Sequence, residues 1–302
     1  MNVVNNASGD ASILINAELA RSAAQGGGEV MLPAGHYSIP STSSIIWPAN
    51  ANGVSLIGEG PFASTILTDA RGSDLLDLTA GNLSHVRIAG LGISVAGPCI
   101  GGALIHAADC YDLIVERVRL DGPYNNGIAI DGGPNQYLTT LINVVCPGDP
   151  RCYCCVIIGQ NVLPQDTYIN LCKFAGTQYG IWVQNASGVY LSSTEVLDHV
   201  HHGFVTYPMA GQVAEWVQAT QFIADTCGET GIYLGSGGGN VRGVSFSNSW
   251  SSNNNNGVEI EAAPLGDNIC FDAATMILVN RNRSVIDYGA TNVRISAYMD
   301  KP

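Results

Sequence analysis

The sequence has few charged residues and very few basic ones. Only 12% of its 302 residues are charged, against about 25% in an average domain. Twelve Lys and Arg stand against 25 Asp and Glu, which gives a formal net charge of −13, and no basic run occurs. Nucleic acids and anionic membranes bind through clustered cations, so neither is an expected partner. Uncharged or weakly charged glycans suit this charge better than anionic polymers, which it would repel.

Long apolar runs are also absent from the sequence. No run approaches the roughly 18 residues that span a membrane. Residues 1–6 lack the basic-then-apolar form of a signal peptide. Apolar residues nevertheless make up 46% of the chain, and the mean hydropathy is +0.17, which is ample for a core. We therefore expect a soluble protein with no visible signal peptide.

Cysteine occurs nine times, an odd number, without a recognisable metal motif. The densest group, CPGDPRCYCC at 146–155, invites a zinc hypothesis, but its spacing matches no standard site and the histidines lie in other repeats. A core thiol is the preferred interpretation of Cys172. A loop disulfide between Cys146 and Cys152 is an alternative for a protein that works outside the cell. No metal site is predicted.

A short apolar strand led by glycine recurs along the chain. Its copies begin at Gly127, Cys155 (in the glycine position), Gly180, Gly203, Gly231 and Gly257. Neighbouring copies start 23 to 28 residues apart, which is the period of a solenoid. A second alternating strand recurs between them, at 113–118, 168–171, 189–191, 241–246 and 293–295. Each repeat is therefore expected to form one coil.

The first 40 residues differ from the repeats. Residues 12–24 have a helical spacing of apolar positions, with Ser8 and Asp10 as capping candidates and Gly26–Gly28 as a stop. Two short strands, 29–32 and 36–39, follow around a Pro-Ala-Gly turn. A helix over the open end of a solenoid would cover the apolar cross-section of the first coil. We expect one domain over residues 1–302, with a cap at 1–40 and coils at 41–302.

The opening segment resembles a known family. Its residues read GDASILINAELARSAAQGGGEVMLPAGHYSI at 9–39, then GVSLIGEG at 53–60 and STIL at 64–67. They are similar to the start of the pectate-lyase-like right-handed parallel β-helix superfamily, which includes many phage tailspikes and polysaccharide depolymerases. The resemblance implies an all-β fold, a right-handed single-stranded parallel β-helix of about ten coils with an N-terminal capping helix. It also implies a polysaccharide or oligosaccharide partner, a homotrimer, and a place outside the cell or on a virion surface.

Stacked coils bring equivalent positions of successive repeats into rows about 4.8 Å apart along the solenoid axis. The outward rows beside the glycine-led strands carry aromatic rings beside carboxylates and amides, which is how proteins bind sugar rings and hydroxyls. The predicted substrate-binding residues are Tyr179, Trp182, Tyr207, Tyr233 and Glu259. Burial in a subunit interface or under a loop is the alternative for the aromatic residues.

Two neighbouring coils carry the densest group of titratable residues. The rows place His201 and Glu229 one coil apart, near Asp198, Asp225 and His202. Glycosidases need two carboxyls about 5 to 9.5 Å apart, depending on stereochemistry. We predict that Glu229 is the general acid or base, with Asp198 or Asp225 as its partner. His201 and His202 would position the substrate.

The dipeptide before Gly203 has a family resemblance of its own. His201-His202-Gly203 is similar, in its last two residues, to the Gly-His-Gly motif of the polygalacturonases, which share the β-helix fold. The paired aspartates that this family carries one coil earlier are absent, since Gln178 and Tyr179 stand there. The resemblance therefore implies a groove position for His202 and not the polygalacturonase chemistry.

Two functions besides the hydrolysis of a polysaccharide stay open. A polysaccharide lyase would use a histidine or Tyr179 as base, and it needs a cation beside the uronate carboxylate. Ca²⁺ held by Asp198, Asp225 and Glu229 would supply that cation, whereas the hydrolase needs no cofactor. A non-catalytic glycan-binding or adhesion module would use the aromatic row alone.

Two polar runs are expected to be structural. Asn tolerates the left-handed conformation and its side chains stack as amide ladders in solenoid turns, so Asn253–Asn256 is predicted to form a turn. The run Gly235–Gly239 is expected to be a flexible loop, because it lacks the lysine and the strand-to-helix setting of a phosphate-binding loop.

Overall fold

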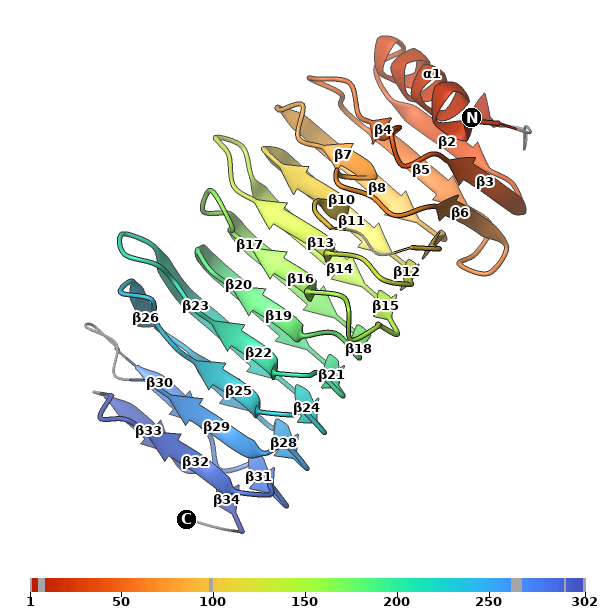
Figure 1. Ribbon diagram of the computed structural model, residues 1–302. Helices are drawn as coiled ribbons and strands as arrows, with labels where there is room; N and C mark the ends of the chain where they lie inside the picture. Colours follow the sequence, from red (N-terminus) through yellow and green to blue (C-terminus); the bar gives the residue numbers. More distant parts are fainter. Residues whose placement is uncertain (1, 5–8, 98–99, 262–267, 291, 301–302) are drawn as a thin grey trace.

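The chain winds into a right-handed solenoid of three parallel sheets, with its two ends at opposite ends of the molecule (Figure 1). The structure is a computed structural model that describes residues 2–4, 9–97, 100–261, 268–290 and 292–300. One sheet contains ten strands, in line with the number of coils expected. The predicted fold class is therefore confirmed.

Each complete coil contributes one strand to each sheet. Sheet A contains β1 (Asn2–Val3), β2 (Gly28–Leu32), β5 (Val54–Gly58), β8 (Leu83–Ala89), β11 (Cys110–Glu116), β14 (Tyr137–Ile142), β17 (Gln165–Asn170), β20 (Ala186–Ser192), β23 (Val213–Thr220), β26 (Asn240–Arg242), β27 (Ser245–Ser247), β30 (Ile269–Phe271) and β33 (Val293–Ile295). Sheet B contains β3 (Gly35–Ile39), β6 (Ser64–Thr68), β9 (Gly92–Val95), β12 (Arg119–Asp121), β15 (Val145–Cys146), β18 (Lys173–Ala175), β21 (Glu195–Leu197), β24 (Ile223–Asp225), β28 (Trp250–Ser252), β31 (Met276–Leu278) and β34 (Tyr298–Met299). Sheet C contains β4 (Ile45–Ile46), β7 (Leu76–Leu78), β10 (Ala103–Ala108), β13 (Asn126–Asp131), β16 (Cys154–Ile158), β19 (Tyr179–Val183), β22 (His202–Thr206), β25 (Thr230–Leu234), β29 (Asn256–Ile260) and β32 (Arg283–Asp287).

The glycine-led repeats form sheet C in the predicted register. One inward row runs through Ile128, Val156, Ile181, Phe204, Ile232 and Val258. All of these side chains are buried in one continuous core. Residues about two dozen apart in sequence are therefore direct neighbours in space.

Close approach of the next coil explains the glycine near the start of β13, β19, β22, β25 and β29. A Cβ atom at Gly180 would lie 2.3 Å from the carbonyl oxygen of Gly203, and one at Gly231 would lie 2.4 Å from Oγ of Ser251. Neither contact leaves room for a side chain without movement of the neighbouring coil. The repeat signature is therefore a packing requirement of the corner between sheets B and C.

The strand predicted at 36–39 is β3, the first strand of sheet B, but the sheet B strands of the later coils were not predicted. From β12 onward these strands are at most three residues long, too short for alternation to reveal them. The single strand expected at 241–246 is also wrong. Gly243 adopts a φ of +64°, and the chain forms β26 and β27 on either side of it instead.

Single residues in the left-handed conformation turn the chain from sheet A to sheet B. They recur once per coil with φ between +45° and +55°, at Arg117, Asn143, Leu171, Ser193, Gln221 and Asn248. The backbone N–H of each bonds to the next coil, as from Leu171 to the carbonyl of Ser192 at 3.0 Å. The coil stack thus holds residue types that rarely adopt this conformation.

The core is filled by aliphatic side chains, a phenylalanine stack and thiols. The rings of Phe246 and Phe271 stack at 5.1 Å and 4°, with Phe204 and Phe222 alongside at 5.7 and 5.8 Å from Phe246. Cys172 is buried, as predicted for a core thiol. The eight cysteines in the described part of the chain are free thiols, so Cys146 and Cys152 form no disulfide, and Cys99 lies outside the described residues.

Helix α1 (Ala11–Ala24) covers the N-terminal end of the solenoid (Figure 1). Oδ1 of Asp10 accepts a 3.0 Å hydrogen bond from the backbone N–H of Ser12, so Asp10 is the N-cap. Ile15 and Leu19 are fully buried against the first coil. The predicted cap is confirmed, while the alternative Ser8 lies outside the described residues. Within the described ranges, no helix is long and apolar enough to cross a membrane.

The asparagine run forms the predicted turn. Asn253 takes a φ of +55°, and Asn254 is buried in an amide ladder between coils. Its Oδ1 accepts from the N–H of Cys227 at 2.8 Å, and its own N–H donates to Oδ1 of Asn280 at 3.1 Å. The side-chain amides thereby replace backbone partners at the corner between sheets B and C.

Candidate functional site

The outward side of β16, β19, β22, β25 and β29, here called the sheet C face, carries a continuous row of aromatic rings. The ring of Trp182 lies 4.7 Å from that of Tyr179 and 5.6 Å from that of Tyr153. The ring of Tyr207 lies 6.4 Å from that of Trp182 and 6.5 Å from that of Tyr233. The four aromatic residues predicted to bind substrate therefore share one surface.

Strand alternation explains the outward direction of Trp182. Ile181 and Val183 enter the core, whereas Trp182 packs outside it against a small apolar cluster that includes Ala129 and Ile157. Its indole Nε1 is buried without a hydrogen-bond partner among the described residues. An unpaired buried donor costs about 1 to 3 kcal/mol. The described part of the protein thus leaves the indole N–H of Trp182 without an acceptor.

His201 and Glu229 meet across adjacent coils, one rung apart as the repeat spacing predicts. Nδ1 of His201 lies 2.9 Å from Oε1 of Glu229, and Nε2 of His202 lies 3.4 Å from Oε2 of Glu229. The Glu229 side chain is 51% exposed, whereas that of His202 is only 15% exposed. The ring of His202 stacks on that of Tyr233 at 4.6 Å and 8°. The Glu229 side chain is thus exposed to solvent, while the His202 ring that it contacts is packed against the ring of Tyr233.

Two carboxylates from the next coil reach the same region. Oε2 of Glu259 accepts a 2.9 Å hydrogen bond from Oγ1 of Thr230, the residue after Glu229. Glu261 accepts a hydrogen bond from the hydroxyl of Tyr233. Glu259, predicted to contact substrate, therefore lies beside the predicted acid or base.

Asp198 and Asp225 lie at the turn that leads from sheet B to the sheet C face. Asp198 follows β21 with a φ of +55°, and Asp225 ends β24. Oδ1 of Asp225 accepts hydrogen bonds from Oγ of Ser252 at 3.1 Å and Nδ2 of Asn253 at 2.9 Å. Among the described residues, no group of three or more His, Cys, Asp or Glu side chains is arranged to hold a metal ion.

Burial shifts the pKa values of three titratable rings on the sheet C face. It lowers the pKa of His202 to about 4 against the opposing effect of the Glu229 carboxylate. Burial and, second, the charge of Glu229 raise the pKa of Tyr179. Burial and the hydrogen bond to Glu261 raise the pKa of Tyr233. At neutral pH the ring of His202 is therefore neutral, and Tyr179 and Tyr233 keep their phenol hydroxyls.

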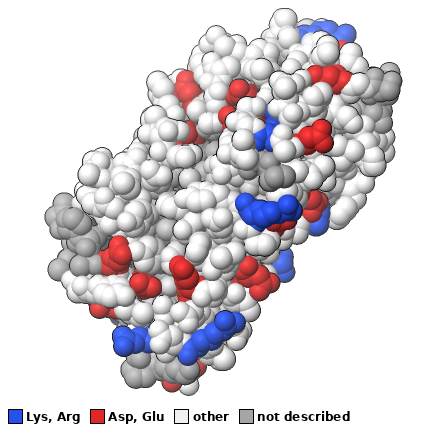
Figure 2. All heavy atoms as spheres, in the orientation of Figure 1, with Lys and Arg blue, Asp and Glu red and all other residues white. Residues whose placement is uncertain are grey.

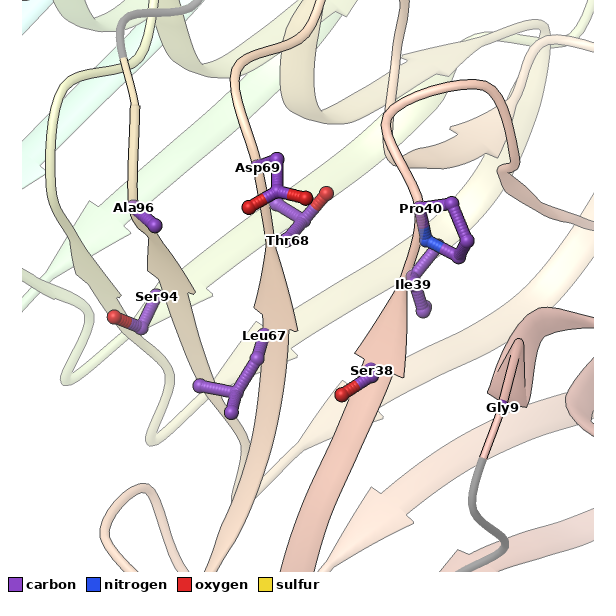
Figure 3. A pocket seen from close by; sticks show the side chains of 9 residues that line it. All are labelled: Gly9, Ser38, Ile39, Pro40, Leu67, Thr68, Asp69, Ser94 and Ala96. Atoms are coloured by element: carbon purple, nitrogen blue, oxygen red, sulfur yellow. The ribbon is translucent and has the colours of Figure 1, made fainter.

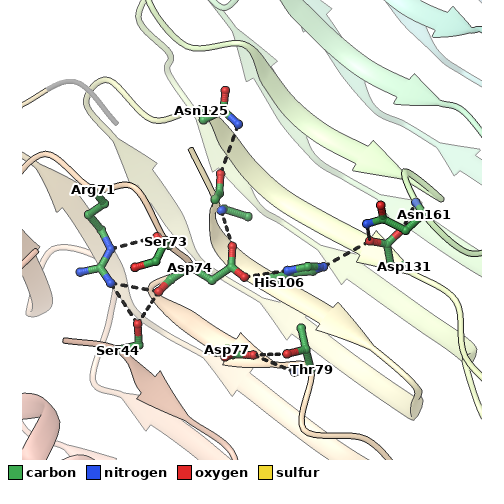
Figure 4. A network of polar contacts seen from close by, with 12 residues as sticks. Ser44, Arg71, Ser73, Asp74, Asp77, Thr79, His106, Asn125, Asp131 and Asn161 are labelled. Atoms are coloured by element: carbon green, nitrogen blue, oxygen red, sulfur yellow. Dashed lines mark hydrogen bonds and ion pairs between the residues drawn. The ribbon is translucent and has the colours of Figure 1, made fainter. Parts of the chain in front are cut away.

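A second polar cluster on sheet C was not predicted from the sequence. Nδ1 of His106 lies 2.8 Å from Oδ2 of Asp74, and its Nε2 lies 3.3 Å from Oδ2 of Asp131 (Figure 4). His106 stands in the same outward row as Trp182. Its coil has Leu104 in the glycine position, so the glycine pattern did not extend to it. Extending the row by spacing alone would have found it.

A surface hollow lies away from the sheet C face. A hollow of about 380 Å³ lies on sheet B, among Ser38, Leu67 and Ser94 (Figure 3). Asp69 is the one ionisable side chain among its lining residues, so it lacks the paired groups that acid–base chemistry needs. The chemistry-bearing residues favour the sheet C face instead.

Charge is sparse over the surface. The side of the molecule in Figure 2 is mostly uncharged, with acidic side chains spread along its length and few basic ones between them. This distribution agrees with the net charge of −13 and offers no extended basic region on that side.

Solved structures of polysaccharide-related proteins share the fold. An A-module of a mannuronan C-5 epimerase from Azotobacter vinelandii is 15% identical, with a TM-score of 0.66 over 97% of this chain and 92% of its own. A tailspike protein of E. coli bacteriophage HK620 is 13% identical, with a TM-score of 0.60 over 99% of this chain and 64% of its own. The catalytic unit of a GH87 α-1,3-glucanase from Streptomyces thermodiastaticus is 11% identical, with a TM-score of 0.51 over 98% and 67%.

No protein-family model matches the chain, and no curated protein matches it in sequence. At 11 to 15% identity the structural likeness concerns the fold. Three parallel sheets, a helical cap at the N-terminal end and these neighbours together show that the chain has the pectate-lyase-like right-handed parallel β-helix fold.

Proposed function

We propose that this protein binds a polysaccharide along the sheet C face and hydrolyses it with Glu229 as general acid or base. The observation that carries the proposal is the aromatic row that runs through Tyr179, Trp182 and Tyr233 beside the carboxylates of Glu229 and Glu259. Aromatic faces bind the apolar side of sugar rings, and carboxylates accept hydrogen bonds from sugar hydroxyls. The three rings and Glu259 lie on strands of sheet C, and Glu229 directly precedes β25.

Glu259 takes the place of the second carboxyl in this proposal. Its carboxylate accepts a hydrogen bond from Thr230, the residue after Glu229, whereas Asp225 is engaged by Ser252 and Asn253. Glu229 would give a proton to the leaving glycosidic oxygen as the bond to the anomeric carbon breaks. Glu259 would take a proton from the water that adds to that carbon. His201 orients Glu229 through its 2.9 Å hydrogen bond.

An uncharged glycan is the proposed substrate class. Glu229, Glu259 and Glu261 are all directed to one region, and like charges repel. A uronate polymer would bring a further negative charge there, and its elimination needs a cation beside the carboxylate. These groups favour hydrolysis over elimination.

Binding without cleavage is the second candidate. The 51% exposure of the Glu229 side chain favours it, because a general acid usually works in a site that excludes water. The aromatic row alone would then hold the glycan, as in an adhesion module.

The likeness to the bacteriophage tailspike supports a further part of the proposal. We place the protein outside the cell or on a virion surface, where polysaccharides are accessible, and we propose that it assembles as a homotrimer. Sedimentation velocity of the purified chain tests the assembly: a mass of three chains is expected, and a monomer at all concentrations contradicts it.

Cleavage assays test the proposed reaction. The protein is incubated with bacterial exopolysaccharides, and reducing ends and absorbance near 235 nm are followed. Glu229→Gln and Glu259→Gln are each expected to lower reducing-end release at least a hundredfold, while Glu195→Gln, which changes an exposed glutamate of sheet B, keeps it. New absorbance would indicate elimination instead. Retention on the polymer without either signal would indicate binding alone.

A further inference from the structure

A hollow on sheet A, away from the sheet C face, is lined by tyrosine rings and by polar side chains. It has a volume of about 290 Å³ and extends over four coils, from Tyr168 on β17 to Ser245 on β27. The rings of Tyr168 and Tyr190 stack at 4.7 Å and 18°, so Tyr190 ends the stack at the next coil. Its other face is turned toward the coil of Gln218, with which Tyr190 pairs.

The floor of this hollow is made of hydroxyl and amide groups. Asn170, Ser192, Thr220 and Ser247 occupy one row on successive coils, about 4.8 Å apart. None of the ten residues that line the hollow is ionisable at neutral pH. Such a surface offers hydrogen bonds at regular intervals and no ion pair to a charged ligand.

Trp216 adds an exposed ring next to the hollow. It stands on β23, two residues before Gln218, and is 55% exposed. Its φ is +55°, at a bulge position that Gly188 and Gly243 occupy in the flanking coils. The same position holds His85, Asp112, Leu138 and Asp166 in the earlier coils, with φ between +50° and +59°, so the coil stack imposes this conformation and does not fix the residue type.

The coil after Trp216 is shaped to accept its ring. A Cβ atom at Gly243 would lie 2.9 Å from Cε3 of Trp216, so the indole lies directly over the glycine. The room left by Gly243 lets a large aromatic side chain lie flat on the surface beside the hollow.

We propose that the sheet A face around Tyr190 and Trp216 is a second binding site, which takes an uncharged oligosaccharide. Ring faces bind the apolar side of a sugar, and the row of hydroxyls and amides binds its hydroxyl groups. An anionic ligand finds no cation among the lining residues and meets a chain of net charge −13. A site on a separate sheet would hold a long glycan while the sheet C face acts on it.

Titration calorimetry with defined neutral oligosaccharides tests this site. The probes are maltohexaose, cellohexaose, laminarihexaose and chitohexaose. At least one is expected to bind, and Tyr190→Ala and Trp216→Gly are each expected to weaken that binding about tenfold or more. Trp216→Gly restores the residue type of the flanking coils, so it is expected to fold.

Matched controls separate this site from the sheet C face and from an interface between chains. Trp250→Ala removes an exposed tryptophan of sheet B and is expected to leave the affinity unchanged, whereas Trp182→Ala reports how much of the binding occurs on the sheet C face. The proposal is overturned if no probe binds, if Trp216→Gly and Tyr190→Ala bind like the wild type, or if only Trp182→Ala loses binding. It is also overturned if either sheet A variant changes the mass in solution, because the face is then a subunit contact.

Discussion

Replacing His106 with asparagine should remove a pH-dependent part of the stability. Burial alone would lower the pKa of this histidine, but hydrogen bonds to Asp131 and Asp74 raise it from 6.5 to about 9. Each pKa unit corresponds to about 1.4 kcal/mol, so the protonated imidazole stabilises the folded chain by about 3 kcal/mol. Its side chain is only 21% exposed, so solvent screens this interaction weakly.

The direction of the pH effect follows from the sign of the shift. Because the folded pKa is raised, the stabilisation is complete below pH 6.5 and is lost as the pH rises through about 9. The pKa values of Asp74 and Asp131 are lowered, against the effect of burial, by their bonds to His106. Their contribution is present above pH 3.8 and is lost as the pH falls through the lowered values.

Urea unfolding at pH 6.5, 8 and 9.5 measures this contribution. Over that range the wild type should lose up to about 3 kcal/mol more than His106→Asn, and His106→Asn should be the less stable of the two at pH 6.5. Burial raises the pKa values of thiols such as Cys110 and Cys172, so both proteins share a further loss of stability near pH 9. His85→Asn is the control, since His85 also faces an aspartate but is 55% exposed, and it should keep the wild-type slope. An equal slope in the wild type and in His106→Asn would refute the reasoning.

Three further predictions concern packing and the site. Gly231→Ala should lower the free energy of unfolding, because the added Cβ would lie 2.4 Å from Oγ of Ser251. The variant should be insoluble or should have a lower midpoint of thermal denaturation than the wild type. Phe246→Ala should cost about 3 to 5 kcal/mol in urea unfolding, as it removes the centre of the phenylalanine stack, and a loss below 1 kcal/mol would contradict the packing described. Tyr233→Phe should cost about 1 kcal/mol through the lost hydrogen bond to Glu261, yet keep glycan binding, because the ring still stacks on its neighbour; loss of binding in calorimetry would show that the hydroxyl itself contacts the ligand.

The repeat register could be predicted because one physical constraint recurs in several coils. Gly180 and Gly231 are required by the close approach of the next coil, so their spacing reports the coil length directly. That spacing was enough to place His201 beside Glu229. It was also enough to align Trp182 with Tyr233 in one outward row.

Other features of the structure could not be predicted, because no residue pattern in the sequence indicates them. Arg117, Leu171 and Gln221 turn the chain in the left-handed conformation, although their residue types do not favour it. The coil stack imposes that conformation through hydrogen bonds between coils. The sheet B strands are too short to alternate, and the carboxylate of Glu259 is directed by a side-chain hydrogen bond to Thr230, which strand periodicity does not reveal.

The central claim is tested most directly by a crystal structure of Glu229→Gln with a bound oligosaccharide. The oligosaccharide is cut from a polysaccharide that the wild type degrades or retains. The account predicts sugar rings along the sheet C face, packed on Trp182 and Tyr233, with a glycosidic oxygen beside residue 229. Sugar bound only on sheet A or sheet B, with Trp182 and Tyr233 free of it, would contradict the claim.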